Sequence, residues 1–213
     1  MKLFIDTANI QDIREMASFG IVSGVTTNPS LIAKEGRKLE DVIHEIVSLV
    51  DGPISAEVAE GKCDDMVKQA IPLAKIHKNI VIKLPMTWEG IKACKILTSQ
   101  GIHTNVTLCF SVSQALLAME AGATYLSPFM GRLDDAGFEA EELIQDIVTV
   151  RDNDGYETKL IAASIRNLHH LEIASLAGAD IATIPTAVFK KMVEHPLTEK
   201  GLQIFADAAK GVK

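Results

Sequence analysis

The sequence predicts an α/β protein that folds as a single-domain (β/α)8 barrel, or TIM barrel, with one extra helix near its C-terminus. Short apolar segments rich in β-branched and aromatic residues alternate eight times with segments that have helical spacing and charged faces. Regular alternation of this kind is typical of βαβ units and a parallel sheet. The 213 residues contain no Ser/Pro-rich linker and no low-complexity stretch, so we expect all eight units to close one barrel.

The predicted strands and helices follow one another along the whole chain. The strands span residues 2–6, 22–27, 54–59, 80–84, 103–108, 124–129, 159–164 and 180–185. The helices span residues 12–19, 39–50, 64–77, 87–99, 111–121, 139–152, 168–177 and 187–194. Gly122 and Gly178 each end a predicted helix just before a strand, as expected for a left-handed helix end. A further helical segment, at about residues 198–209, lies beyond the eighth unit of the single domain, which covers residues 1–213.

The composition is that of a soluble globular protein, with 47% hydrophobic and 23% charged residues. The net charge of −7 gives no reason to expect nucleic acid or an anionic membrane as a partner. Cys63, Cys94 and Cys109 are odd in number and form no C-x-x-C pair, which favours a reducing compartment over disulfides or zinc. Because neither a signal-peptide pattern nor an apolar run of membrane-spanning length is present, we expect a cytoplasmic protein.

Polar side chains gather on one side of the predicted strands. Alternate strand residues face opposite sides of a sheet, so in a barrel one set faces the interior and the other the helices. In seven of the eight strands, polar groups lie late in the strand and opposite its apolar set. They are Asp6, Thr26, Asn28, Ser55, Glu57, Lys83, His103, Asn105, Thr107, Ser127, Ser164 and Arg166. Phe129 shares the side of Ser127, and in the seventh strand Ala162 shares the side of Ser164 and Arg166, opposite Ile161. Active sites of such barrels form at the C-terminal ends of the strands, so we expect one site there.

Lys83 is the most unusual of these residues, because it interrupts the apolar run of residues 80–84 just before Pro85. Taken alone, a lysine at a strand end is more often structural, with its ammonium reaching water. Burial among β-branched residues disfavours the charged form, however, and Schiff-base chemistry on a carbonyl needs a neutral amine. We therefore predict that Lys83 is a nucleophile. A permanent ion pair would keep the amine charged, so we expect neither Asp6 nor Glu57 to pair tightly with it.

The remaining polar residues supply what Schiff-base chemistry requires. Carbinolamine dehydration and C–C cleavage both move protons. We expect Asp6 to act as acid and base at the substrate hydroxyl whose C–C bond breaks. Glu57 and Thr107 would hold a water that mediates the other proton transfers. The amides of Asn28 and Asn105 suit the orientation of substrate hydroxyls.

Two further groups complete the predicted site. Thr26, Ser127 and Phe129 are expected to contact the substrate, since they share the interior side of their strands. Arginine matches phosphate by bidentate hydrogen bonding, and the loops after strands 7 and 8 often bind phosphate in these barrels. We therefore expect a phosphate site formed by Arg132, Ser164 and Arg166.

Other chemistries find little support in the sequence. The six histidines form no H-x-H or H-E-x-x-H pattern, and His169 and His170 are adjacent on a predicted helix and point in different directions. No G-x-G-x-x-G, Walker or G-x-S-x-G motif occurs. We therefore expect neither a metal nor a cofactor. Cys109 lies beside the site in the sequence but on the helix-facing flank of its strand, so we expect its thiol to be inert.

Five segments of the sequence carry a family pattern. They are Phe4-Ile5-Asp6-Thr7-Ala8, Gly24-Val25-Thr26-Thr27-Asn28-Pro29-Ser30, Lys83-Leu84-Pro85, Asn105-Val106-Thr107 and Ala162-Ala163-Ser164-Ile165-Arg166. With these motifs the chain resembles the transaldolases from end to end, and in particular the short transaldolases that group with fructose-6-phosphate aldolase. The resemblance implies a (β/α)8 barrel that needs no metal or cofactor. It also implies transfer of a dihydroxyacetone unit from a ketose phosphate to an aldose phosphate, as in the non-oxidative pentose phosphate pathway.

The resemblance assigns the same roles to the site residues. It makes Lys83 the Schiff-base lysine, Asp6 the acid and base, and Glu57 with Thr107 the holders of the catalytic water. The substrate-orienting amides are Asn28 and Asn105, and the phosphate ligands are Arg132, Ser164 and Arg166. Short transaldolases are similar in carrying an extra C-terminal helix that packs on a neighbouring subunit of ring-like pentamers and decamers. The segment at residues 198–209 is its counterpart, so the resemblance implies a homo-oligomer.

Two alternatives remain at this point. The aldolase branch of the same family releases free dihydroxyacetone and, as the family pattern implies, has glutamine at position 57 and tyrosine at position 129. Glu57 and Phe129 favour transfer, because a phenol near the Schiff base can help to protonate the bound carbanion. Arg166 and Asn105 also favour the transferase. The second alternative is a sugar-phosphate-binding barrel without catalysis, but it does not explain two carboxylates beside Lys83, since carboxylates repel phosphate.

Overall fold

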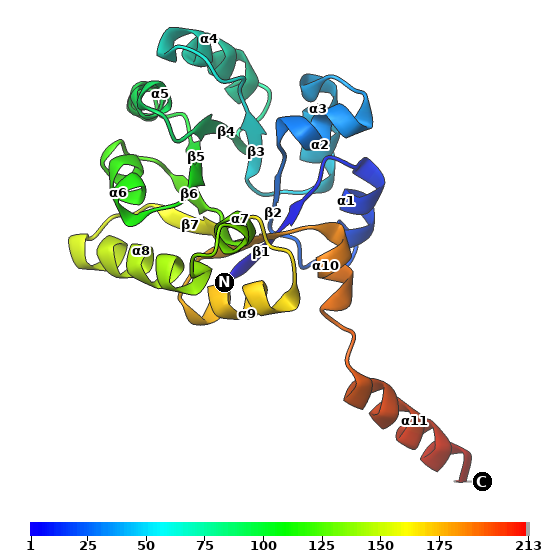
Figure 1. The fold of residues 1–213 in the computed structure, drawn as a ribbon. Helices are drawn as coiled ribbons and strands as arrows, with labels where there is room; N and C mark the ends of the chain where they lie inside the picture. The colour runs from blue at the N-terminus through cyan, green and yellow to red at the C-terminus, as the bar shows by residue number, and fades with distance from the viewer. Residues whose placement is uncertain (212–213) are drawn as a thin grey trace.

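The computed structural model describes residues 1–211 and shows a closed barrel of eight parallel strands surrounded by helices (Figure 1). Strands that are consecutive in the chain are neighbours in the barrel, and β1 pairs with β8 to close it. The strands are β1 (Lys2–Asp6), β2 (Gly24–Thr26), β3 (Ile54–Glu57), β4 (Ile80–Pro85), β5 (Thr104–Cys109), β6 (Tyr125–Pro128), β7 (Lys159–Ala162) and β8 (Ile181–Ile184). The predicted (β/α)8 barrel is therefore confirmed.

Every predicted helix has a counterpart in the structure. The helices are α1 (Ile10–Ala17), α2 (Pro29–Glu35), α3 (Leu39–Leu49), α4 (Cys63–Ala74), α5 (Trp88–Ser99), α6 (Val112–Glu120), α7 (Met130–Asp135), α8 (Ala140–Asp154), α9 (Leu168–Leu176), α10 (Thr186–Lys191) and α11 (Pro196–Gly211). The sequence analysis did not predict α2 and α7, which have seven and six residues and are too short to show a helical repeat. Both lie just after the C-terminal end of a strand, so both border the mouth of the barrel.

Polar caps mark several of the points where the chain leaves the barrel and begins a helix. The side chains of Asn28, Thr87 and Asn167 each accept a hydrogen bond from a backbone N–H in the first turn of α2, α5 and α9. These N–H groups have no partner within the helix, so each cap stabilises the helix start. The caps fix the loops that follow β2, β4 and β7 at the same end of the barrel.

The barrel interior is filled at one end and polar at the other. Phe4, Ile161 and Ile181 pack together with Tyr125 at the N-terminal end. Gly24 is needed beside them, because a Cβ atom there would lie 2.5 Å from the Phe4 ring. The helix-facing sides of the strands join a separate and larger core with the helices. Apolar packing thus closes one end of the barrel and leaves the C-terminal end for polar side chains.

The prediction of which residues of the seventh strand face the barrel interior was wrong. Ile161 belongs to the interior cluster and Ala162 to the helix-facing core, the reverse of what was expected. β7 ends at Ala162, and Ser164 has a left-handed backbone with φ of 59°. The alternation of side chains along β7 therefore does not predict which way Ser164 and Arg166 point. These residues reach the barrel mouth by a turn of the chain.

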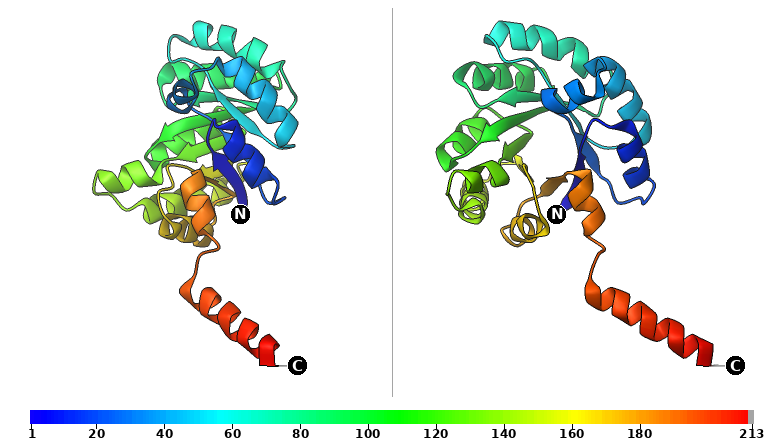
Figure 2. Two further views of the ribbon diagram at one scale, coloured as in Figure 1. Left: turned by 90° about the vertical axis from the view of Figure 1, so that its right-hand side faces the viewer. Right: turned by 45° about the vertical axis from the view of Figure 1, so that its right-hand side comes forward.

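The last helix, α11, projects away from the barrel (Figure 2). It confirms the predicted extra C-terminal helix, and none of its residues is buried. Among residues 1–211, no helix is long and apolar enough to cross a membrane.

Candidate active site

A pocket of about 130 Å³ lies inside the C-terminal end of the barrel. It brings together predicted site residues that are far apart in the sequence. They are Asp6, Thr26, Asn28, Lys83, Ser127, Phe129, Arg132 and Ser164, and Ala163 and Thr183 complete the lining. Glu57, Asn105, Thr107 and Arg166 do not line this pocket, and their positions are described below.

Lys83 is buried and makes an ion pair with Glu57. The two residues are register partners on β4 and β3, so their side chains leave adjacent strands on the same side. Lys83 Nζ lies 2.9 Å from Glu57 Oε2 and donates to the Thr27 carbonyl oxygen at 3.2 Å. The expectation that neither carboxylate would pair tightly with Lys83 was therefore wrong. The physical reason is that a buried ammonium needs a nearby compensating charge, and the β3–β4 register provides one.

Asp6, at the end of β1, is held by hydroxyl groups. Thr26 Oγ1 donates to Asp6 Oδ1 at 2.8 Å, and Thr183 Oγ1 lies 2.5 Å from Thr26 Oγ1. Burial raises the pKa of Asp6 above its ordinary 3.8, and the negative charge of Glu57 adds to the increase. The Thr26 hydrogen bond and the positive charge of Lys83 act in the opposite direction. A carboxyl group in this setting is suited to taking up and releasing a proton.

Asn105 lies beneath the pocket and is fixed by two serines. Ser127 Oγ donates to Asn105 Oδ1 at 2.8 Å, and Asn105 Nδ2 donates to Ser55 Oγ at 3.2 Å. Asn28 is oriented differently, because its Oδ1 accepts from Leu31 N at 2.9 Å and so caps α2. The amide nitrogen of Asn28 is therefore the group available to a substrate in the pocket.

Thr107 lies on the same side of β5 as Asn105 and is buried. Within the described residues, its Oγ1 has no hydrogen-bond partner. A β-bulge follows it, with Leu108 at a φ of 63°, and turns Cys109 into the helix-facing core. Burial raises the pKa of the Cys109 thiol to about 12, so the thiolate is scarce at neutral pH. This agrees with the inert thiol expected from the sequence.

The phosphate residues come from two segments that meet at the barrel mouth. Arg132, on α7, lies over the Phe129 ring at 5.1 Å from its centre, and Phe110 packs edge-on against the same ring. Ser164 follows β7 and lines the pocket. Arg166 lies further out, where its Nη1 donates to Asp135 Oδ1 at 2.6 Å. Two of the three predicted phosphate ligands therefore line the pocket, and the third is paired at its edge.

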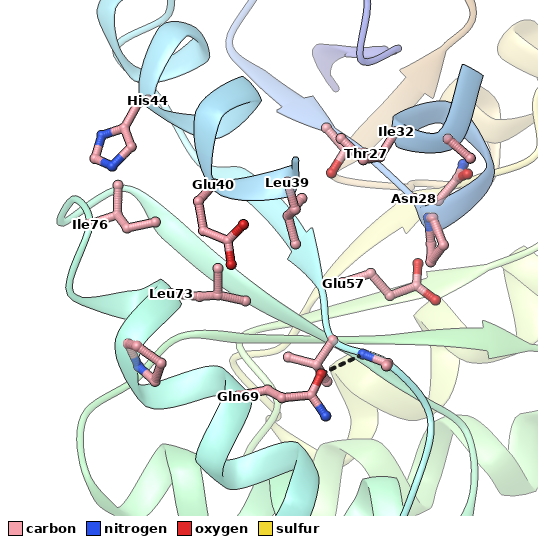
Figure 3. A pocket seen from close by; sticks show the side chains of 15 residues that line it. Thr27, Asn28, Ile32, Leu39, Glu40, His44, Glu57, Gln69, Leu73 and Ile76 are labelled. Carbon is pink, nitrogen blue, oxygen red and sulfur yellow. Dashed lines mark hydrogen bonds between the residues drawn. The ribbon is translucent and has the colours of Figure 1, made fainter. Parts of the chain in front are cut away.

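A larger cavity of about 700 Å³ lies beside the pocket, between α2, α3 and α4 (Figure 3). It shares Asn28 with the pocket and is bordered at one end by Glu57. The rest of its lining is mainly apolar, with Thr27, Glu40, His44 and Gln69 as the other polar side chains around it. Since no lysine or arginine among residues 1–211 lines it, this cavity is poorly suited to a phosphate, and the smaller pocket remains the candidate site.

Comparison with known proteins identifies the family. A family model described as "Transaldolase/Fructose-6-phosphate aldolase" matches residues 3–212. The chain belongs to this family. A "Probable transaldolase" of Geobacter sulfurreducens is 59% identical over 205 residues, which cover 96% of each chain. A "Probable transaldolase" of Bartonella quintana is 56% identical over 207 residues, or 97% of this chain and 95% of that protein.

One solved structure shares this barrel fold. Thiamine phosphate pyrophosphorylase from Pyrococcus furiosus superimposes with a TM-score of 0.61 over 88% of this chain and 86% of its own. The two sequences are 16% identical, so the likeness concerns the fold alone. The transaldolase-family assignment rests on the sequence matches.

Thr183 is the pocket residue that the sequence analysis missed in this transaldolase-family barrel. It shares the interior side of β8 with Ile181, is buried, and contacts Thr26. A single polar residue between Ala182 and Ile184 on the expected interior side was the available signal. It was overlooked because a lone threonine is ordinary in a strand. Among residues 1–211, no group of three or more His, Cys, Asp or Glu side chains is placed to hold a metal ion.

Asp6→Asn should raise the free energy of unfolding at pH 7, so the variant should be more stable than the wild type. Asparagine can still accept from Thr26, but it removes a buried carboxylate. Because the pKa of Asp6 is raised in the folded protein, its carboxylate does not destabilise the fold at a pH below 3.8. It destabilises the fold fully at a pH above the folded-state pKa. The gain should therefore shrink as the pH falls towards 3.8. Urea denaturation of both proteins at several pH values measures it.

The exposed Asp146, on α8, provides the control for this substitution. Asp146→Asn should change the free energy of unfolding by less than about 0.5 kcal/mol at every pH. A stability gain in Asp6→Asn that did not vary with pH, or a loss at pH 7, would contradict the role of burial at Asp6.

Proposed function

We propose that this protein is a transaldolase that forms a Schiff base on Lys83 and acts in the cytoplasm without a metal or cofactor. It would transfer a dihydroxyacetone unit from sedoheptulose 7-phosphate to glyceraldehyde 3-phosphate, giving erythrose 4-phosphate and fructose 6-phosphate, in the pentose phosphate pathway. The observation that carries this proposal is the position of Lys83. Its amine is buried at the barrel mouth, in a pocket with Asp6 and 2.9 Å from Glu57.

The first step forms the Schiff base. Glu57 accepts a proton from Lys83 Nζ, which leaves a neutral amine beside a carboxylic acid. The amine adds to the C2 carbonyl of the ketose phosphate, and one N–H proton moves to the C2 oxygen to give a carbinolamine. The proton returned by Glu57 then allows the C2 hydroxyl to leave as water. The product is a protonated Schiff base, and Glu57 is again a carboxylate. The 2.9 Å separation supports direct transfer between the two side chains.

The second step breaks and remakes a C–C bond. Asp6 takes the proton of the C4 hydroxyl, the C3–C4 electron pair moves towards the iminium, and the aldose phosphate leaves as an aldehyde. The remaining three-carbon enamine attacks the acceptor aldehyde, and Asp6 returns its proton to the new hydroxyl. The setting of Asp6 supports this role, because burial raises its pKa while Thr26 keeps its carboxylate oriented.

Hydrolysis then frees the product from Lys83. Glu57 and Thr107 are the groups we assign to the water that adds to the Schiff base. The buried Thr107 hydroxyl, which lacks a partner among the described residues, supports this assignment because a water would satisfy it. The amides of Asn28 and Asn105 and the hydroxyls of Thr26 and Ser127 would orient the sugar.

The phosphate of each sugar would be held by Arg132, Ser164 and Arg166. Arg132 and Ser164 line the pocket that contains Lys83, which supports this assignment. Arg166 uses one nitrogen for Asp135 and retains other donors for a phosphate. Its exposed ion pair with Asp135 is weak enough to yield to a more highly charged ligand.

The alternative is an aldolase that releases free dihydroxyacetone. That reaction requires the enamine to be protonated, and the ring nearest the pocket, Phe129, carries no phenol. Phe110 on one side and Arg132 on the other hold this ring in place. An apolar ring at this position lengthens the life of the enamine, so the acceptor aldehyde can react with it. Phe129 and Glu57 therefore favour transfer.

Borohydride reduction tests the nucleophile. Fructose 6-phosphate and borohydride together should add a reduced three- or six-carbon fragment to the peptide that contains Lys83, as read by mass spectrometry. Lys83→Ala should show no such adduct and should lose activity by at least about a thousandfold. Lys190→Ala, which changes an exposed lysine paired with Glu15, is the control and should label as the wild type does. A wild-type protein without the adduct would exclude both the transaldolase and the aldolase.

Turnover with and without an acceptor separates transfer from cleavage. With fructose 6-phosphate alone the enzyme should be nearly inactive, and erythrose 4-phosphate should restore turnover. Phe129→Tyr should raise the release of free dihydroxyacetone relative to transfer by about tenfold or more, since a phenol offers a proton to the enamine. Phe110→Tyr, the same change on the neighbouring ring, should leave the ratio unchanged. Free dihydroxyacetone released by the wild type regardless of acceptor would favour the aldolase.

The quaternary structure is also a proposal, namely a homo-oligomer in which α11 packs on a neighbouring subunit. The family resemblance suggests a pentamer or decamer. Leu197, Leu202, Ile204 and Phe205 are exposed on α11, which supports an apolar contact with another chain. Light scattering should give about five or ten times the chain mass of 23.0 kDa. Phe205→Lys should lower that mass and Gln203→Lys on the same helix should not, whereas a wild-type monomer would contradict the assembly.

A further inference from the structure

His170 is a buried histidine behind the phosphate residues, and both nitrogens of its ring have partners. It lies in the first turn of α9, where its backbone N–H donates to the capping Asn167 side chain at 2.8 Å. Its Nδ1 accepts a hydrogen bond from Arg166 N at 3.3 Å, and its Nε2 lies 2.9 Å from Asp134 Oδ2. The adjacent His169 is exposed.

These two contacts select one form of the imidazole ring. Because Nδ1 accepts from a backbone N–H, it carries a lone pair and no proton. The proton of the neutral ring is therefore on Nε2 and points to the Asp134 carboxylate. In the other tautomer, the Nδ1–H group of His170 would point at the backbone N–H of Arg166, and no hydrogen bond could form between two donors. His170 thus acts as a donor on one side and an acceptor on the other.

The two partners of His170 belong to the two segments that carry the phosphate residues. Asp134 lies on α7, two positions after Arg132, and Arg166 lies in the loop after β7, two positions after Ser164. The segments also touch directly, since Gly131 N donates to Ser164 O at 3.0 Å. A Cβ atom on Gly131 would lie 2.6 Å from Arg166 Nε, so the Arg166 side chain lies against the backbone of α7.

The His170 ring is less exposed to water than the ion pair that joins the same two segments. The side chains of Arg166 and Asp135 are 47% and 58% exposed, so solvent screens their attraction. The His170 side chain is 8% exposed and that of its partner Asp134 is 39% exposed, so the ring side of this contact is shielded from water. Ser164 also has a left-handed backbone, which persists only where neighbouring contacts hold it. The Gly131 hydrogen bond is made to the carbonyl oxygen of Ser164 itself, and the His170 hydrogen bond is made to the backbone N–H two residues later.

We propose that His170 is a positioning residue of the phosphate site. Its ring fixes the separation between Arg132 on α7 and Ser164 and Arg166 after β7, and so sets the preference for phosphorylated over unphosphorylated sugars. This inference rests on the proposed function, because it takes those three residues as the phosphate ligands.

Three substitutions at His170 test the two contacts separately. His170→Asn keeps an acceptor at the place of Nδ1 and loses the donor to Asp134. His170→Gln keeps an amide N–H near the place of Nε2 and loses the acceptor for Arg166 N. His170→Ala loses both contacts. His169→Ala, on the neighbouring exposed residue, is the control.

The readouts are KM and kcat for fructose 6-phosphate, the same constants for unphosphorylated fructose, and competitive inhibition by inorganic phosphate. His170→Ala should raise KM for fructose 6-phosphate and the inhibition constant of phosphate about tenfold, roughly the loss of one charge-assisted hydrogen bond. His170→Asn and His170→Gln should lie between alanine and wild type. Rates with fructose, and all constants of His169→Ala, should stay within about twofold of the wild type.

A purely structural role would give a different result. It would lower the activity with phosphorylated and unphosphorylated sugars alike, and that outcome would overturn the inference. An unchanged phosphate inhibition constant in the Asn and Gln variants would also overturn it, and these variants carry the test if His170→Ala does not fold. In the wild type, ¹⁵N NMR should show His170 protonated at Nε2 and bare at Nδ1, and the reverse tautomer would contradict the geometry.

The wild type separates failure of this inference from failure of the proposed function. If phosphate does not inhibit the wild type, and the wild type does not prefer fructose 6-phosphate over fructose, the proposed phosphate site itself is contradicted. If the wild type shows both the inhibition and the preference, and the His170 variants retain them, only the role of His170 is contradicted.

Discussion

The ion pair between Lys83 and Glu57 is the interaction on which the rest of the site depends. Taking either charge out of water alone would be strongly unfavourable, and the attraction at 2.9 Å offsets this because both side chains come from paired positions of β3 and β4. The barrel therefore holds the amine beside a carboxylate. In the proposed reaction, a single short proton transfer would make the amine nucleophilic without any movement of the backbone. The same transfer would remove both charges from the interior, so reaction and electrostatics would be coupled.

Two carboxylates near one lysine can have separate roles because their surroundings differ. Glu57 faces the ammonium directly. Asp6 instead receives a hydroxyl hydrogen bond from Thr26, which in turn contacts Thr183, while burial raises its pKa. Carboxyl groups whose environments differ in this way are suited to different proton-transfer steps. The hydroxyl chain also explains why β8, which looks featureless in the sequence, still contributes to the site.

The strands were predictable from the sequence, and the segments beyond their ends were not. Alternation of apolar and polar residues is enough to place Asp6, Glu57 and Lys83 in one barrel interior, because the barrel fixes the side of each strand residue. It fails at Ser164, which follows the end of β7 in a left-handed conformation. Helices α2 and α7 are too short to show a repeat. The Lys83–Glu57 pair was not predicted for another reason: a buried ammonium needs a compensating charge nearby, whatever reaction its amine takes part in.

This division has a consequence for how the site is built. Residues on strands, such as Lys83, gain their precision from the hydrogen-bonded register of the barrel. Arg132 and Ser164 lie on α7 and on the loop after β7, where no register holds them, so they need additional contacts. The Gly131–Ser164 backbone hydrogen bond and the buried ring of His170 provide these contacts. Such contacts are local, so the proposed phosphate end of the site could change while the amine and its carboxylates stay in place. In the proposed function, specificity and chemistry would thus be carried by separate parts of one barrel mouth.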